Sequence, residues 1–289
     1  MPDREIHKIG LIGWPIKHSL SPKLHQAAIA FQQIPWQYDL YPIDPANFDH
    51  EIHKLLASDL RGFNVTAPYK ESIIPFLDEC DESSKKLQAV NTVCKMEDGC
   101  WMGSNTDVIG LRKALMGFGL LGKVQQKVTV LGNGGVARAV LAVLLEFPIH
   151  TIEILARNQK KTIQLIDLFS DQIRSGTQIR SGAITEELVA KSIGSADLVI
   201  NATPVGMDHC DQKSVFEEGT QLPNHLKFVD LIYHPAETRM MQQVRFAGGM
   251  AWNGLDMLIY QAAASFTLWT GLDAPVEEMK EAVLQRMLI

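Results

Sequence analysis

The sequence predicts an α/β protein with two domains, the second of them built on a doubly wound parallel sheet. The chain has 289 residues, which is long for one hydrophobic core. Short apolar segments alternate along it with segments of helical periodicity. A glycine-rich turn directly follows the buried strand predicted at 127–131. These three observations favour alternating strands and helices over an all-helical or all-β chain.

The first predicted domain covers residues 1–107 and opens with a strand followed by a helix. Ser21 and Pro22 form a helix start signal, so Ser21 is expected to cap that helix. The dipeptide Asp98-Gly99 predicts the turn of a hairpin. The expected elements are strands at 8–13, 36–41 and 62–66, helices at 22–31, 47–58 and 79–87, and hairpin strands at 91–95 and 100–102.

The second predicted domain covers residues 108–253 and begins with a helix at 108–118 that leads away from the first. Strands that alternate with helices imply a parallel, doubly wound sheet. Two terminal helices are expected to pack back on the first domain, so that residues 254–289 complete it. The remaining elements are strands at 127–131, 151–155, 198–201 and 228–231 and helices at 136–147, 161–170, 254–271 and 274–288.

Composition excludes several classes of function. The net charge of -6 disfavours broad nucleic-acid binding. No signal-like apolar segment opens the chain and no apolar run is long enough for a membrane span, so we expect a cytoplasmic protein with no membrane partner. No zinc-like spacing is present, and free structural thiols are expected at Cys80, Cys94, Cys100 and Cys210. His50 and His53 are better explained by a solvated helix than by a metal site.

Residues 132–137 read Gly-Asn-Gly-Gly-Val-Ala and connect a predicted strand to a predicted helix. Glycines allow a tight turn and let backbone N–H groups approach a pyrophosphate at the positive end of a helix. Ala137 replaces the usual third glycine, so a structural turn without a ligand remains an alternative. The residues expected to hold a dinucleotide here are Gly132, Gly134, Gly135 and Val136.

The end of the next strand indicates which dinucleotide binds. Ala156, Arg157 and Asn158 stand where NAD-binding folds place an acidic residue, and no acid is present. Arg157, with Lys160 and Lys161 close by, could hold a 2′-phosphate, which favours NADP and leaves NAD possible. The alternative is a solvated basic helix start, although positive charge at a helix N-terminus is unfavourable without an anion.

Several blocks spread over almost the whole chain resemble the shikimate dehydrogenase family. Residues 13–22 (Gly-Trp-Pro-Ile-Lys-His-Ser-Leu-Ser-Pro) look like its substrate loop, and residues 64–70 (Asn-Val-Thr-Ala-Pro-Tyr-Lys) like its catalytic block. Asn91-Thr92 and residues 103–107 resemble further substrate blocks. The resemblance implies that Lys70 and Asp107 are a catalytic pair. It also implies substrate contacts from Ser19, Ser21, Asn64, Thr66 and Asn91.

Part of this interpretation follows from the residue types alone, without the resemblance. Asn64 and Thr66 alternate with an apolar residue at a strand end, so both can meet a hydroxylated ring. Lys70 is expected at a helix start, where the positive helix end and partial burial would favour loss of its proton. Without the resemblance, Lys70 could be a plain surface lysine and Asp107 the cap of the following helix.

Three further blocks of the family fall later in the chain. Residues 201–207 resemble the loop beside the cofactor, which implies contacts from Thr203 and Pro204. Residues 230–238 and 254–261 resemble two more blocks, and imply that Leu231 and Gly254 adjoin the cofactor while Tyr233 and Gln261 bind the substrate. The chain departs from the family at Ala156, at Asn253 and at residues 239–241, where Arg-Met-Met occurs.

The resemblance implies an NADP-dependent oxidoreductase that reversibly reduces 3-dehydroshikimate to shikimate on the route to chorismate and the aromatic amino acids. A quinate/shikimate dehydrogenase that prefers NAD is the nearest alternative. A non-catalytic nicotinamide sensor is a remote one, because such a protein could lose Lys70 or Asp107 at no cost. We expect a monomer or a homodimer with a small-molecule substrate.

Overall fold

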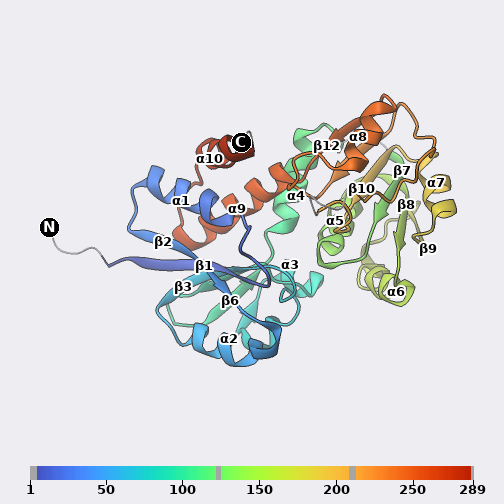
Figure 1. Cartoon of the computed structure of the whole chain (residues 1–289). Helices are drawn as coiled ribbons and strands as arrows, with labels where there is room; N and C mark the ends of the chain where they lie inside the picture. Colours follow the sequence, from blue (N-terminus) through green and yellow to red (C-terminus); the bar gives the residue numbers. More distant parts are fainter. Residues whose placement is uncertain (1–4, 122–124, 208–212, 288–289) are drawn as a thin grey trace. The chain divides into compact units, whose positions relative to one another are not determined.

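The computed structural model describes residues 5–121, 125–207 and 213–287, and the chain divides into two compact units (Figure 1). Unit 1 consists of residues 1–110 and 259–289, and unit 2 of residues 111–258. The chain passes from unit 1 to unit 2 within helix α4 (Asp107–Gly117) and returns within helix α9 (Leu255–Thr270). The α/β class predicted from the sequence is confirmed, while the function of each domain stays a prediction.

Unit 1 contains a six-stranded mixed sheet in the order β2-β1-β3-β5-β6-β4. The first three strands are parallel, and β3-β5 and β5-β6 are antiparallel. Its elements are β1 (His7–Gly13), α1 (Ser21–Gln32), β2 (Trp36–Pro42), η1 (Pro45–Asn47), α2 (Phe48–Leu56), β3 (Leu60–Val65), η2 (Ile74–Phe76), β4 (Glu79–Cys80), α3 (Glu82–Leu87), β5 (Thr92–Lys95), β6 (Trp101–Ser104) and α10 (Val276–Met287).

The two faces of strand β3 carry different chemistry. Successive side chains of a strand point to opposite faces. Phe63 and Val65 join a hydrophobic core that includes residues of α2. Gly62 and Asn64 face the other way, toward the C-terminal helix α9, and a Cβ on Gly62 would lie 2.3 Å from the indole nitrogen of Trp269. Figure 1 shows α2 on one side of these strands and α1 and α10 on the other, which confirms that the C-terminal helices pack on the first domain.

Three local predictions for unit 1 are wrong. The helix predicted at 79–87 begins only at Glu82, because Asp81 caps it by accepting a bond from the Ser84 N–H at 2.6 Å. Residues 79–80 form strand β4 beside β6. Ser21 does not cap α1, since the N-cap residue is Leu20 and it makes no side-chain cap bond. Lys70 lies in a turn after β3 and begins no helix. The helix-end argument for its proton therefore has no basis.

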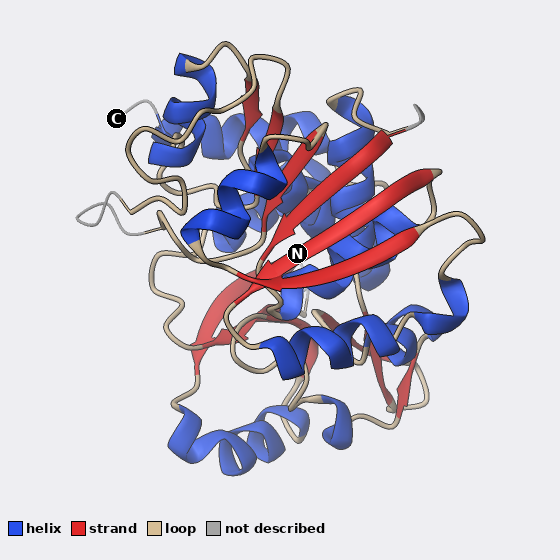
Figure 2. Ribbon diagram, turned by 90° about the vertical axis from the view of Figure 1, so that its right-hand side faces the viewer, coloured by secondary structure: helices blue, strands red, loops and turns tan. Residues whose placement is uncertain are grey.

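Unit 2 has the predicted parallel, doubly wound sheet, with six strands in the order β12-β11-β10-β7-β8-β9. This order is that of dinucleotide-binding folds, which bind their ligand where the strand order reverses, here between β7 and β10. Figure 2 shows the twist of the strands and the helices packed around them. The elements are β7 (Gln125–Leu131), α5 (Gly135–Leu145), β8 (Ile149–Ala156), α6 (Gln159–Asp167), η3 (Ser170–Gln172), β9 (Gln178–Ala183), α7 (Glu186–Ile193), β10 (Leu198–Asn201), β11 (Lys227–Asp230), α8 (Arg239–Phe246) and β12 (Met250–Trp252).

Two strands and two α-helices of unit 2 were not predicted, namely β9, β12, α7 and α8. Strands β9 and β12 are the two edges of the sheet, and the residues of β9 are exposed or half-buried rather than apolar and enclosed. Helices α7 and α8 are short, and each begins at a threonine cap, Thr185 and Thr238. Edge strands and short capped helices carry too little apolar periodicity to predict.

Among the described residues no helix has the length and apolar character needed to span a bilayer.

Cys80, Cys94 and Cys100 carry free thiols, and burial raises the pKa of Cys94 to about 12. The thiolate is the reactive form, so Cys94 is expected to be inert. Cys210 lies outside the described residues.

Candidate active site

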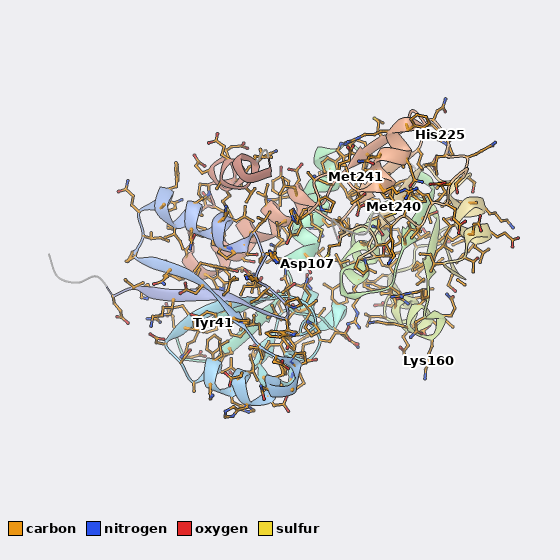
Figure 3. All side chains as sticks on the ribbon, viewed as in Figure 1. Tyr41, Asp107, Lys160, His225, Met240 and Met241 are labelled. Carbon is orange, nitrogen blue, oxygen red and sulfur yellow. The ribbon has the colours of Figure 1, made fainter. Side chains whose placement is uncertain are left out.

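Lys70 and Asp107 form an ion pair in unit 1. The Lys70 Nζ donates to Asp107 Oδ2 at 2.6 Å, and the two side chains are 18% and 7% exposed. Lys70 is therefore not a plain surface lysine. Asp107 is the first residue of α4 (labelled in Figure 3), and its carboxylate bonds to side chains from elsewhere in the unit, so it does not act as the helix cap.

Asn91 fixes the other oxygen of that carboxylate. The backbone N–H of Thr106 can only donate, and it donates to Asn91 Oδ1 at 2.7 Å. The amide nitrogen of Asn91 therefore points the other way and donates to Asp107 Oδ1 at 2.8 Å. Asn105 accepts from the Asp107 N–H at 3.1 Å and holds the backbone at the same point. Both oxygens of Asp107 thus have fixed donors.

Asn64 and Gln261 belong to the same hydrogen-bond network. The Oε1 of Gln261, on α9, accepts from the Asn91 amide at 3.3 Å. Asn64 is only 4% exposed and its Oδ1 accepts from the Tyr38 hydroxyl at 2.9 Å. Its Nδ2 donates to the Asn91 carbonyl at 3.1 Å. Protein groups therefore occupy much of the bonding capacity of Asn64, which leaves less of it for a substrate than the resemblance implies.

Ser19 and Ser21 lie in the segment that joins β1 to α1, and Thr66 directly follows β3. Ser19 Oγ accepts from the backbone N–H of Ser21 at 3.2 Å, so the two serines are joined at the start of α1. The Thr66 N–H donates to the Ile12 carbonyl at 2.9 Å, which ties the end of β3 to the end of β1. Residues at the carboxyl ends of parallel strands are well placed to meet a ligand. The substrate-binding role of the serines stays a prediction.

The glycine turn of unit 2 fits a dinucleotide pyrophosphate. Gly132 has a φ of 99°, and a Cβ there would lie 3.0 Å from the Ala202 carbonyl oxygen, so close packing of the turn against the loop after β10 requires glycine. A Cβ on Gly134 or Gly135 would meet nothing within 4 Å. Helix α5 has no side-chain cap bond at its N-terminus. No capping side chain therefore competes with a ligand at this helix end, where anions bind in other proteins.

The end of β8 presents positive charge next to the start of α6. Arg157 is exposed, and Lys160 points outward from the helix (Figure 3). Asn158 caps α6 by accepting from the Lys161 N–H at 3.0 Å, so its side-chain oxygen is already used. Ala156 is buried and its carbonyl accepts from Gln159 Nε2 at 2.7 Å. The positive charge expected to meet a 2′-phosphate therefore comes from Arg157 and the lysines of α6.

A buried carboxylate holds the loops after β10 and β11, which carry further predicted ligand contacts of unit 2. Asp230 Oδ1 accepts from Asn201 Nδ2 at 2.9 Å and Oδ2 accepts from the Thr238 hydroxyl at 2.7 Å. Burial raises the pKa of Asp230, and the bonds from Thr238 and Asn201 oppose the rise. Asn201 Oδ1 accepts from the Thr203 N–H at 3.0 Å. The loops after β10 and β11, which carry Thr203, Pro204, Leu231 and Tyr233, are therefore tied to one buried group.

The departure from the family at residues 239–241 falls in the core of unit 2. Met240 and Met241 are 0% and 1% exposed (labelled in Figure 3) and pack with α7 and the sheet. Arg239 opens helix α8 and bonds to Glu218. Met240 and Met241 therefore contribute to core packing rather than to polar contacts with a ligand.

Gly254 is required for packing, and its replacement by Ala is expected to destabilise the protein. An added Cβ would lie 2.2 Å from the Leu231 carbonyl oxygen, a backbone atom that cannot rotate away. We expect Gly254→Ala to lower the free energy of unfolding by about 1–3 kcal/mol, measured by urea denaturation. Gly117→Ala is the control, since a Cβ there meets nothing within 4 Å and alanine favours a helix. Equal stability of the two variants would contradict this close packing.

Comparison with known proteins assigns the family. Residues 11–93 match a family model described as "Shikimate dehydrogenase substrate binding domain", and residues 254–284 match one described as "Shikimate 5'-dehydrogenase C-terminal domain". A relative, the shikimate dehydrogenase (NADP(+)) of Desulforamulus reducens, is 35% identical over 95% of this chain and 93% of its own length.

Solved structures agree with this assignment. A crystal structure of a shikimate dehydrogenase in complex with NADP+ superposes with a TM-score of 0.87 and 33% identity, covering 98% of this chain and 96% of that one. A quinate dehydrogenase from Corynebacterium glutamicum in complex with NAD superposes with a TM-score of 0.85 and 28% identity, covering 97% of this chain and 100% of that one. The fold, the sequence blocks and these relatives together show that the chain belongs to the shikimate dehydrogenase family.

Proposed function

We propose that this protein catalyses the NADP-dependent, reversible reduction of 3-dehydroshikimate to shikimate. The observation that carries the proposal is the partly buried Lys70–Asp107 ion pair, which lies in blocks shared with the family. Reduction of a ketone to an alcohol needs one hydride and one proton. The nicotinamide supplies the hydride when it is bound, so the protein has to orient the ring and handle the proton.

Lys70 and Asp107 would handle that proton. In the reduction, an ammonium on Lys70 would donate a proton or a hydrogen bond to the oxygen that becomes the alcohol. Asp107 would hold Lys70 in one place, since its own carboxylate is fixed by Asn91 on the other oxygen.

Steady-state kinetics of the purified full-length chain test the proposal. Formation of reduced nicotinamide would be followed with shikimate and with quinate, each with NADP+ and with NAD+. We expect the highest kcat/KM for shikimate with NADP+. A preference for quinate with NAD+ would favour the activity of the Corynebacterium relative instead. Absence of turnover in all four mixtures would favour a non-catalytic nicotinamide sensor.

Arg157 is expected to set the cofactor preference. An Arg157→Asp variant would lose its charge-assisted bonds to the 2′-phosphate and place a carboxylate near it, so kcat/KM for NADP+ should fall about 10- to 100-fold. The value for NAD+ should change little, because NAD+ has no 2′-phosphate. Arg180→Asp, an identical charge change at the exposed edge strand β9, is the control. An unchanged ratio of the two cofactors would discredit Arg157 as the phosphate ligand.

We also expect the protein to act in the cytoplasm as a monomer or a homodimer on a small-molecule substrate. Size-exclusion chromatography with light scattering would settle the oligomeric state.

A further inference from the structure

Ser265 occupies the centre of the buried polar network behind the Lys70–Asp107 pair. It lies on α9, one turn after Gln261, and is 0% exposed. Its Oγ is 3.0 Å from the Asn64 amide nitrogen, 2.8 Å from Thr92 Oγ1 and 3.1 Å from Thr106 Oγ1. It also lies 3.0 Å from the Gln261 carbonyl oxygen. One hydroxyl thus connects strands β3 and β5, the segment before α4, and helix α9.

The donors and acceptors around Ser265 leave little freedom. The Asn64 nitrogen can only donate, and the Gln261 carbonyl can only accept. Ser265 Oγ then has one lone pair left, and the hydroxyls of Thr92 and Thr106 are both close enough to donate to it. All these groups are buried, so removal of the Ser265 hydroxyl would leave several of them without a partner or force them to rotate.

The threonine hydroxyls transmit the arrangement to the catalytic pair. Each threonine hydroxyl has one hydrogen, so when one donates to Ser265 Oγ the other is free to donate to Asn91. Thr92 Oγ1 and Thr106 Oγ1 lie 3.1 and 3.2 Å from Asn91 Oδ1. That oxygen is one end of the amide whose nitrogen holds Asp107 Oδ1. A rotation of either threonine hydroxyl would therefore change the hydrogen bonds of the Asn91 amide, which also holds the Asp107 carboxylate.

We propose that Ser265 is a positioning residue for the reaction: its hydroxyl orients Thr92 and Thr106 so that Asn91 holds Asp107, and through it Lys70, in one arrangement. Ser265 itself contacts these protein groups and acts only through them. The inference rests on the proposed function, because its effect is read in turnover of shikimate. It predicts that the hydroxyl matters for kcat more than for binding.

The first test compares Ser265→Ala with Ser84→Ala in the full-length protein. Ser84 is another fully buried serine of unit 1, and its hydroxyl has no hydrogen-bond partner within the described part of the chain. With shikimate and NADP+, we expect Ser265→Ala to lower kcat about tenfold, while KM for either substrate changes less than about threefold. Ser84→Ala should keep the kcat of the unaltered protein. A Ser265→Ala kcat within about twofold of that value would overturn the proposal.

The second test separates the hydroxyl from its packing. Ser265→Thr and Ser265→Val add the same volume, but only threonine keeps an oxygen that can bond to the carbonyl four residues earlier. We expect the kcat of Ser265→Thr to exceed that of Ser265→Val at least about fivefold. Equal kcat in the two variants would overturn the proposal, because packing alone would then explain the loss. A lack of turnover by the unaltered protein would instead reject the proposed function.

Discussion

A Lys70→Ala variant is expected to lose about a hundredfold or more in kcat for shikimate oxidation, with a smaller change in KM. The loss corresponds to about 2.7 kcal/mol of transition-state stabilisation. Lys70 is the only cation that the structure places on the Asp107 carboxylate among the described contacts, and it would act on the oxygen that gains or loses a proton. Initial rates with saturating NADP+ and varied shikimate give kcat and KM separately.

The matched control for this experiment is Lys85→Ala. Lys85 belongs to the same unit and is exposed on α3. Its replacement should leave kcat unchanged and so exclude a general effect of lost positive charge. Near-native turnover of Lys70→Ala would reject Lys70 as the proton-handling residue, whatever the outcome of the control.

The architecture of unit 2 could be predicted largely from its buried strands. The apolar segments that form β7, β8, β10 and β11 are enclosed by other elements, so their composition alone identifies them. The glycine turn after β7 then fixed the expected place of the ligand. The edge strands β9 and β12 could not be found this way, because an exposed strand has no enclosed run of apolar residues.

The catalytic pair could be predicted only through the family resemblance. From residue types alone, Lys70 could be a surface lysine, and the physical reason offered for its activation was wrong because no helix begins there. What makes Lys70 unusual is a contact with Asp107, 37 residues further along the chain. A contact of this kind depends on the packing of unit 1 and leaves no mark on the local sequence.

The buried network behind the pair was even less accessible to prediction. Ser265 bonds to Asn64 across 201 residues and to Thr92 across 173 residues. The available signal was a serine four residues after Gln261 on a largely apolar helix, since a buried polar group needs a partner. Such a signal indicates that a partner exists and does not identify it. Likewise, the bond from Tyr38 to Asn64 shows that Asn64 belongs to this network, which the substrate-binding interpretation did not anticipate.

An Asp107→Asn variant should show how strongly the pair acts as a unit. Asparagine has the same shape, but its amide carries hydrogens where Asp107 accepts bonds from both Asn91 and Lys70. If its oxygen faces Asn91, its nitrogen faces the Lys70 ammonium, so one of the two bonds becomes a contact between donors. We therefore expect kcat to fall about a hundredfold, with KM for shikimate changed less.

The double variant Lys70→Ala/Asp107→Asn decides whether the two residues work together. If Asp107 acts mainly by holding Lys70, its replacement adds little once the lysine is gone, and the double variant should have a kcat within about threefold of Lys70→Ala. If the two losses multiply instead, each residue contributes independently and Asp107 touches the reacting atoms by itself. Glu79→Gln is the control, because Glu79 is an exposed carboxylate of unit 1 on strand β4. It should leave kcat unchanged both in the unaltered protein and in the Lys70→Ala variant.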